Sequence, residues 1–262
     1  MHKLVVVIIV LGIISLSFNI NSFPTDIGKV KNEAFKRGEI LSYRLHYGVI
    51  EAGTAVLEVK EEVKEIGARK TYHIVGTGIS RGAFDWFFKV RDKYETFIDE
   101  EAMVPWLFIR RVNEGGYTIS QNYVFNHSAK KVNADGKNFD IPENIQDMLS
   151  AFYYTRCVDY SAAKEGEVFT IHSFVDQEIF PLKIRYVGKE TIETAIGKFR
   201  CIKFRPVLQK GRIFKAEEDL NVWISDDKNH IPIRAEAKIL VGSIKMDLQT
   251  YSGLANPFSK IE

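Results

Sequence analysis

Hydrophobic and polar side chains alternate along most of this chain. In residues 39–47, one face carries Leu41, Tyr43, Leu45 and Tyr47, and the other carries Ser42, Arg44 and His46. A period of two is typical of β-strands that bury one face. Turn-forming glycine, asparagine and aspartate separate the segments. The pattern predicts strands at residues 39–47, 54–63, 70–78, 84–98, 105–113, 117–126, 167–175, 179–187, 190–194, 198–206, 216–225, 231–240 and 243–251, with a short hairpin around 133–136.

One segment in the middle of the chain follows a different period. Asp140 and Glu143 have the spacing of a capping box, and Pro142 between them is tolerated in the first turn of a helix. The pattern therefore predicts an amphipathic helix over residues 142–156. Its apolar stripe, at helical spacing, consists of Ile145, Met148, Leu149 and Phe152.

A single amphipathic helix among about a dozen strands must bury its stripe, and the concave face of the sheet is the only large apolar surface available. The fold class predicted is mainly β: a large curved antiparallel sheet, a half-barrel or open barrel, wrapped around one amphipathic helix. We expect a single β-rich domain over residues 35–256, preceded by an N-terminal lead-in at 23–34.

The first residues have the features of a secretory signal peptide. One basic residue, Lys3, precedes an unbroken apolar run at residues 4–14, and small residues follow at Ser15 and Ser17. The run is shorter than the roughly 20 residues that a membrane span needs. We expect residues 1–22 to be removed, which predicts a periplasmic protein. No cysteine follows the apolar run, so we do not expect lipidation.

Composition narrows the partners. Hydrophobic residues make up 45% of the chain, and its formal net charge is +2. Such a balanced charge gives no indication of nucleic-acid binding. Two cysteines, Cys157 and Cys201, permit one disulfide in an oxidising compartment, and two separate buried thiols are the alternative.

The chain shows no motif for nucleophilic or metal chemistry. Its six histidines are scattered singly, and none has the spacing of a zinc site. Asp226, Asp227 and Asn229 are explained by a tight turn. We therefore predict no catalytic residue, no metal site and no cofactor.

Aromatic residues give the strongest indication of a binding site. Rings on a predicted strand at 84–98, on the next strand and on the helix would line a groove for an acyl chain or an apolar peptide. Plain packing between helix and sheet is the alternative. Flanking arginines would hold a polar head group, or the charges there would pair with Asp147 or Arg156 and fix the helix. The predicted ligand-binding residues are Phe84, Trp86, Phe88, Trp106, Phe108, Tyr153, Arg81 and Arg91.

Several phrases of the sequence occur together in a known family. They are FKRGEILSY at 35–43, YGVIEAGTA at 47–55, SRGAFDWFFKVRD at 80–92, QDMLSAFYYTR at 146–156, GKFRC at 197–201 and WISDDKNHIP at 223–232. In these phrases the chain resembles the exported bacterial family called domain of unknown function 3108, of the Bacteroidetes type, over about residues 35–254. The resemblance implies an envelope protein. More loosely, it implies the half-barrel of periplasmic lipoprotein carriers, although a shared fold does not fix function.

These features predict a non-enzymatic periplasmic protein that binds a lipid, an acyl chain, another hydrophobic or envelope-derived ligand, or a partner in envelope biogenesis. Two other classes stay open. One is an envelope glycan or lipid hydrolase that uses carboxylates such as Asp85, Asp92 and Glu95, which would have to face one cleft. The other is a structural interaction module. The sequence specifies neither the ligand nor the oligomeric state.

Overall fold

The computed structural model describes residues 29–207, 220–238 and 243–261, so the predicted signal peptide lies outside the described residues. Strands account for most of the described chain. Its elements are β1 (Ile40–Tyr47), β2 (Ile50–Ile66), β3 (Arg69–Ser80), α1 (Gly82–Phe87), β4 (Arg91–Asp99), β5 (Pro105–Glu114), β6 (Tyr117–Asn126), β7 (Lys131–Ala134), β8 (Lys137–Asp140), α2 (Met148–Arg156), β9 (Val168–Val175), β10 (Glu178–Thr194), β11 (Gly197–Pro206), β12 (Leu220–Ser225), β13 (Pro232–Lys238), β14 (Ser243–Ser252) and β15 (Lys260–Ile261).

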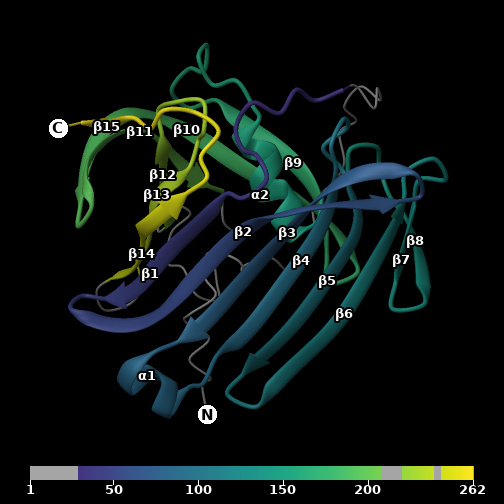
Figure 1. The fold of residues 1–262 in the computed structure, drawn as a ribbon, viewed down its shortest axis with the longest axis horizontal. Coiled ribbons are helices and arrows are strands. Elements are labelled where there is room, and N and C mark those ends of the chain that lie inside the picture. Colours follow the sequence, from purple (N-terminus) through teal and green to yellow (C-terminus); the bar gives the residue numbers. More distant parts are fainter. Residues whose placement is uncertain (1–28, 208–219, 239–242, 262) are drawn as a thin grey trace.

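All the strands belong to one antiparallel sheet. Its order is β8-β7-β6-β5-β4-β3-β2-β1-β14-β13-β12-β11-β10-β9, and β15 pairs with β11. Hairpins connect most neighbours, and the pairing of β1 with β14 joins the two ends of the chain into one surface. The sheet curves strongly around α2 and does not close into a barrel (Figure 1). The predicted fold class is therefore confirmed.

Alternation along β4 shows which face of the sheet receives the helix. Asp92, Tyr94, Thr96 and Ile98 are buried on that face. The Thr96 hydroxyl donates to Asp147 Oδ2, at the start of α2, over 2.6 Å. On β3 the same face carries Gly76, where an added Cβ would lie 3.3 Å from Leu57 and 3.7 Å from Leu149. Glycine thus lets the helix pack closely against the sheet.

The helix begins later than the sequence pattern predicts. Asp147 is its N-cap: the carboxylate accepts from the backbone N–H groups of Leu149 and Ser150, and the Ser150 hydroxyl accepts from the Asp147 N–H. The predicted capping box of Asp140 and Glu143 is therefore wrong. Asn144, at φ 56°, turns the chain out of any helix that would start at 142.

The buried stripe of α2 is also shifted from the predicted one. Leu149 and Tyr153 are fully buried, whereas Met148 and Phe152 are half-buried. Ile145 is buried but precedes the helix. The predicted burial is confirmed for Leu149, whereas Met148 and Phe152 are only partly buried against the core, because the helix presents its i, i+4 pair, Leu149 and Tyr153, to the sheet.

The strand predicted at residues 84–98 is interrupted. Its first part forms the short helix α1, and β4 begins only at Arg91. Gly82, at φ 56°, reverses the chain after β3 in a conformation that side chains with a Cβ disfavour. The run from Phe84 to Phe88 lacks alternation, and a short apolar run does not distinguish strand from helix.

The two edge strands, β8 and β9, approach each other without pairing. The ring centroids of Phe139 on β8 and Phe174 on β9 lie 5.4 Å apart. The segment before α2 runs beside β9: the Gln146 N–H donates to the His172 carbonyl over 2.9 Å, and the Phe174 N–H donates to the Gln146 carbonyl over 2.7 Å. This segment therefore covers an edge that would otherwise expose unpaired backbone groups.

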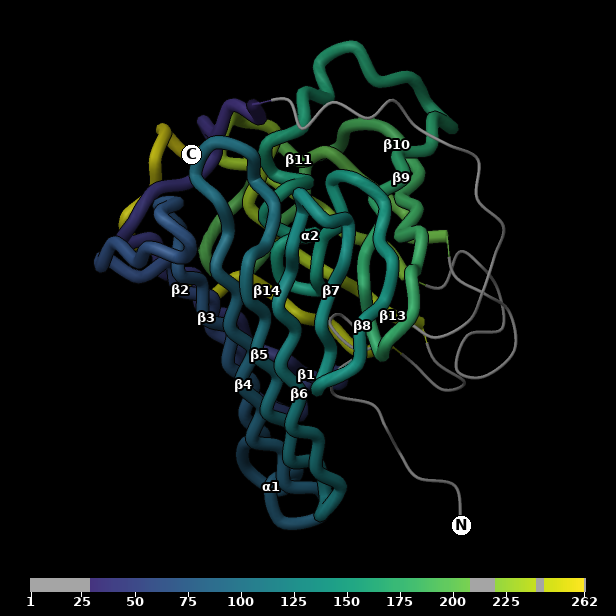
Figure 2. Tube along the Cα trace, turned by 90° about the vertical axis from the view of Figure 1, so that its right-hand side faces the viewer, coloured from purple at the N-terminus to yellow at the C-terminus, as the bar shows by residue number. Residues whose placement is uncertain are grey.

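Strands β3 to β6 continue beyond the rest of the sheet as a tongue, and α1 lies at its end (Figure 2). We call this part of β3–β6 together with α1 the tongue. Among the described residues, no helix is both long and apolar enough to cross a membrane.

Candidate functional site

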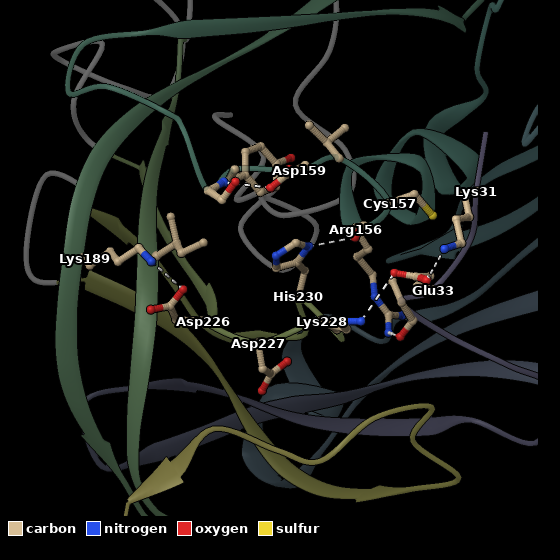
Figure 3. Close-up of a pocket in the computed structure, with 15 residues that line it drawn as sticks. Lys31, Glu33, Arg156, Cys157, Asp159, Lys189, Asp226, Asp227, Lys228 and His230 are labelled. Carbon is tan, nitrogen blue, oxygen red and sulfur yellow. Dashed lines mark hydrogen bonds and ion pairs between the residues drawn. The ribbon is translucent and has the colours of Figure 1, made fainter. Parts of the chain in front are cut away.

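A pocket of about 440 Å³ lies between the lead-in before β1, the end of α2 and the turn from β12 to β13 (Figure 3). It is at the opposite end of the sheet from α1. The segments that form it are far apart in the sequence. Its lining residues are Lys31, Glu33, Ala34, Arg156, Cys157, Val158, Asp159, Tyr160, Ser161, Lys189, Ile202, Asp226, Asp227, Lys228 and His230.

One wall of the pocket is apolar. Tyr160, in the loop that follows α2, donates its hydroxyl to the Thr155 carbonyl over 2.8 Å. Its ring lies 4.8 Å from that of Phe204 on β11, centroid to centroid. These two residues belong to a small apolar cluster with Tyr186 and Ile202. The cluster is separate from the main core under α2, so this end of the sheet has an apolar surface of its own.

The turn from β12 to β13 forms a second wall. Asp227 organises it by accepting hydrogen bonds from the Ser225 hydroxyl, the Asn229 N–H and the Ser259 N–H, at 2.9, 2.8 and 2.7 Å. The interpretation of Asp227 and Asn229 as turn residues is confirmed. His230 follows with φ 44°, a left-handed conformation that is uncommon for histidine.

His230 lies at the centre of the lining residues in Figure 3. Its Nδ1 is 2.8 Å from the Arg156 carbonyl, so the proton on Nδ1 donates to that oxygen. The ring also makes an edge contact with Tyr160, at 5.3 Å between centroids. These contacts orient the imidazole, and in the neutral ring they leave Nε2 as an acceptor.

A buried ion pair forms the base of the pocket. Arg156, 2% exposed, donates two parallel hydrogen bonds to the carboxylate of Glu39, 0% exposed, at 2.6 and 2.7 Å. Its Nε donates to the Asn229 carbonyl over 3.0 Å. Phe35 and Tyr153 cover the guanidinium at 5.3 and 5.1 Å. The pair therefore ties α2 to the start of β1 and to the β12–β13 turn.

Charges of both signs surround the opening. Lys31 and Lys228 approach the same carboxylate, that of Glu33, at 2.5 and 3.6 Å. The hydrogen bond from Lys31, together with the positive charges of both lysines, holds the pKa of Glu33 below its usual range. On the other side of the pocket, Lys189 pairs with Asp226 at 2.8 Å (Figure 3). These exposed pairs are weak, so their charged groups can exchange partners at little cost.

The pocket offers hydrogen bonds, charge and apolar surface. It holds one thiol, that of Cys157, and burial raises the pKa of this thiol to about 12. Cys157 therefore stays protonated at neutral pH and is a poor nucleophile. Over residues 29–207, 220–238 and 243–261, no hydroxyl or thiol is hydrogen-bonded to His230, and no group of three His, Cys, Asp or Glu side chains is arranged to hold a metal.

The aromatic residues predicted to bind ligand do not line one groove. Trp86 is exposed on α1, and Phe88 next to it packs against Gly115. Trp106 is at the opposite end of β5, and its Nε1 donates to Asp99 over 2.9 Å. Glu114 bridges to the chain just after α1, and the eight residue steps from Trp106 to Glu114 span about 26 Å of extended strand.

The other predicted rings belong to the core. Phe108 and Tyr153 are fully buried, and Phe84 packs against the core from α1. Phe108 contacts Tyr123 at 5.6 Å, and Tyr153 contacts Phe35 at 4.8 Å. For these rings the structure shows packing between helix and sheet, which was the alternative interpretation.

The two predicted arginines lie at the tongue. Arg91 donates hydrogen bonds of 2.6 and 3.1 Å to the carboxylate of Asp85, and Arg81 is exposed at the N-cap of α1. Neither reaches the helix α2. The suggested pairing of these charges with Asp147 or Arg156 is therefore wrong, because the two α2 residues find their partners in Thr96 and Glu39.

The carboxylates considered for a hydrolase do not converge on one cleft. Asp85 lies on α1, Asp92 is buried on the inner face of β4, and Glu95 is on the outer face, paired with His73 at 2.9 Å. Asp92 instead neighbours Glu114 on β5. Burial, together with the negative charge of Asp92, raises the pKa of Glu114 to about 7.

The two cysteines are free thiols in this structure. Cys157 ends α2, and Cys201 is buried on β11. The alternative of two separate thiols is the one that the structure shows.

Sequence reasoning did not identify the pocket. Its residues come from five separated segments, and no local motif joins them. The one local pattern in the pocket was the group Asp226, Asp227 and Asn229, which turn formation explained, and His230 was counted only among the scattered histidines. The loop after α2, with Val158 and Tyr160, carried no signal beyond its apolar side chains.

The sequence profile of a protein family of unknown function, DUF3108, matches residues 42–249 of this chain, which is most of its length. The chain belongs to the DUF3108 family. The resemblance found in the sequence is therefore confirmed, and the matched region runs from β1 to β14. No curated protein matches the chain.

One solved structure shows the same kind of fold. A β-barrel-like protein of the family DUF1849 from Brucella abortus superposes with a TM-score of 0.55 at 11% identity, over 84% of this chain and 98% of that protein. A proposed lipoprotein from Parabacteroides distasonis has a TM-score of 0.37 at 12% identity, over 87% and 100%. A proposed exported protein with a YmcC-like fold from Bacteroides fragilis has 0.34 at 11%, over 83% and 97%. At 11% identity the similarity to the Brucella protein concerns the fold alone.

Proposed function

We propose that this member of the DUF3108 family is exported to the periplasm and binds an amphiphilic ligand from the cell envelope in the pocket beside His230. The proposal takes the protein to be a binding protein without catalytic activity. The observation that carries it is the combination of an apolar wall, an oriented imidazole and a rim of loosely paired charges in one pocket of about 440 Å³. That volume suits part of a lipid or a short acyl chain.

The two walls would receive different parts of the ligand. An apolar chain would lie against Tyr160, Val158 and Ile202, where it would cover the small apolar cluster. A polar or anionic head would lie between Lys228 and Lys189, both of which are in exposed ion pairs that can open. His230 would add a hydrogen bond, because its ring is already held by the Arg156 carbonyl.

Filling the pocket tests this proposal. Val158→Trp places a large ring among the lining residues and should weaken binding of a fluorescent fatty acid on the order of tenfold or more. Val168→Trp on β9 is the matched control, because Val168 is exposed and does not line the pocket. Titration of both variants with the probe, with melting curves for each, gives the comparison. Equal affinity in Val158→Trp and wild type would refute binding at this pocket.

Two further measurements concern the origin of the ligand and of the protein. Mass spectrometry of small molecules that co-purify from native periplasm should show a reproducible lipid. N-terminal sequencing of protein from cells should begin between Phe18 and Phe23, because Ser15 and Ser17 place small residues at the expected cleavage site. Soluble protein that retains Met1 would refute the proposed export.

A further inference from the structure

The tongue ends in a set of exposed apolar side chains. Trp86 and Phe87 on α1 are 83% and 74% exposed, and their rings contact each other at 4.8 Å. Neighbouring hairpins add three exposed residues: Val49 and Ile50 at the turn into β2, and Tyr117 at the start of β6. We call Val49, Ile50, Trp86, Phe87 and Tyr117 the aromatic tip. They are five of the ten large hydrophobic residues exposed in the described part of the chain.

The helix α1 is fixed to both hairpins. On one side the Arg81 N–H donates to the Ala52 carbonyl over 3.0 Å. On the other side the Gly115 N–H donates to the Lys89 carbonyl over 2.9 Å. Phe88 packs so closely on Gly115 that a Cβ there would clash with the ring. The backbone of the tip is therefore held in place, and the exposure of Trp86 and Phe87 does not come from a loose end of the chain.

Folding makes no use of the exposed rings. No residue of α1 is buried, and the core contact of this segment comes from Phe84 on its other side. Two adjacent aromatic rings in water lose the free energy that burial would provide, and exposed apolar surface of this kind is typical of an interaction surface.

Positive charge flanks the patch. In the part of the chain that the structure describes, Arg81 and Lys89 are exposed and form no ion pair, and they stand on either side of α1. Of the acidic groups nearby, Asp85 pairs with Arg91 at 2.6 Å and Glu51 lies 3.9 Å from Arg44, whereas Asp92 and Glu114 lie together on the inner face of the sheet and are not exposed. Among the exposed side chains next to the rings, the charge without an ion-pair partner is therefore positive.

We propose that the aromatic tip docks on an anionic lipid surface, with Trp86 and Phe87 at the level of the headgroups and Arg81 and Lys89 against lipid phosphates. Tryptophan prefers the boundary between water and hydrocarbon, and exposed cations next to apolar rings are the usual composition of a surface anchor. The helix α1, which carries Trp86 and Phe87, lies at the end of the tongue (Figure 2), so it can reach a flat surface before the rest of the sheet does. This site is distinct from the pocket beside His230.

The test is flotation of the mature protein with vesicles. Wild-type protein should float with vesicles of equal phosphatidylcholine and phosphatidylglycerol, and less with phosphatidylcholine alone. Trp86→Ala combined with Phe87→Ala should lower the partition coefficient on the order of tenfold or more. Arg81→Gln and Lys89→Gln should each lower it roughly fivefold, and added salt should do the same. Val124→Ser with Val168→Ser removes exposed apolar residues elsewhere and should leave binding unchanged.

Fluorescence locates the contact. The chain has three tryptophans. The indole N–H groups of Trp106 and Trp223 donate hydrogen bonds to Asp99 and Glu190 within the protein. A blue shift on vesicle binding, and its quenching by brominated lipid, should therefore come from Trp86. Trp86→Phe should still float but lose the shift.

Each contrary outcome overturns the proposal. Wild-type protein that stays unbound, or a double alanine variant that floats as well as wild type, would refute lipid docking. So would sedimentation showing that the tip joins two copies of the chain while vesicles bind neither form. Because Val158→Trp changes the pocket and not the tip, its failure to bind the fatty-acid probe while still floating would separate this proposal from the proposed function.

Discussion

Charged and apolar side chains are arranged in opposite ways at the two ends of the curved sheet. At the pocket end, Arg156 and Glu39 form an ion pair inside the protein, 2% and 0% exposed. At the tongue end, Trp86 and Phe87 are exposed on a helix that buries none of its residues. Both ends therefore depart from the usual arrangement, in which charges face water and rings face the core.

The two departures have different energetic meanings. The buried pair joins α2, β1 and the β12–β13 turn, and each of its polar atoms finds a partner, so it fixes the geometry of the pocket. The exposed rings contact each other but not the core, so their position is the one expected of an interaction surface. The comparison thus separates residues that hold the structure together from residues available for contact.

Breaking the buried ion pair should give the largest effect. Arg156→Met leaves the Glu39 carboxylate buried without a partner, and this should lower the free energy of unfolding by about 3–5 kcal/mol. The matched control is Arg91→Met, which breaks the exposed pair with Asp85 at the tongue and should leave stability nearly unchanged. Urea denaturation of both variants measures the difference. Similar losses in the two variants would show that the ends are not distinct.

The next largest effect on stability should come from the contact between α2 and the sheet. Leu149→Ala removes a fully buried side chain next to Gly76 and should cost about 3 kcal/mol. Met148→Ala removes a half-buried neighbour and should cost about 1 kcal/mol. Thermal melting of the pair tests the position of the helix. A larger loss for Met148 would mean that α2 presents its other side to the sheet.

A smaller effect should appear as a dependence on pH. Burial and the charge of Asp92 raise the pKa of Glu114 to about 7 in the folded protein, above its usual value of 4.5. The protonated form thus stabilises the fold below pH 4.5, and this contribution is lost as the pH rises through 7. Glu114→Gln should gain stability over wild type between pH 5 and pH 8, on the order of 1 kcal/mol at pH 8. A constant difference across this range would contradict the assignment.

How far the sequence predicts this molecule depends on the range of the interactions involved. Alternation is local, and it placed strands such as β6 at their observed bounds, Tyr117–Asn126. The start of α2 was missed because its N-cap, Asp147, is also held by a residue far away in the sequence, Thr96 on β4. The helix α1 was missed because a short apolar run does not distinguish a helix from a strand.

The candidate site was less predictable for the same reason. The pocket depends on a curved sheet that brings Lys31, Tyr160 and His230 together across about 200 residues of chain. The exposure of Trp86 could not be predicted either, because a large aromatic side chain is expected to be buried. A buried role is the ordinary expectation for such an aromatic run, and the burial of a ring depends on whether a partner surface exists.

The smallest effect on stability is expected at the aromatic tip, and it provides the most direct test of the contrast between the two ends. Trp86→Ser combined with Phe87→Ser should change the free energy of unfolding by no more than about 0.5 kcal/mol, because neither ring is buried. The same protein should lose its flotation with anionic vesicles. Urea denaturation and flotation of this one variant decide the matter. Unchanged stability with lost flotation is the result we predict, and a loss of several kcal/mol, or flotation equal to wild type, would contradict it.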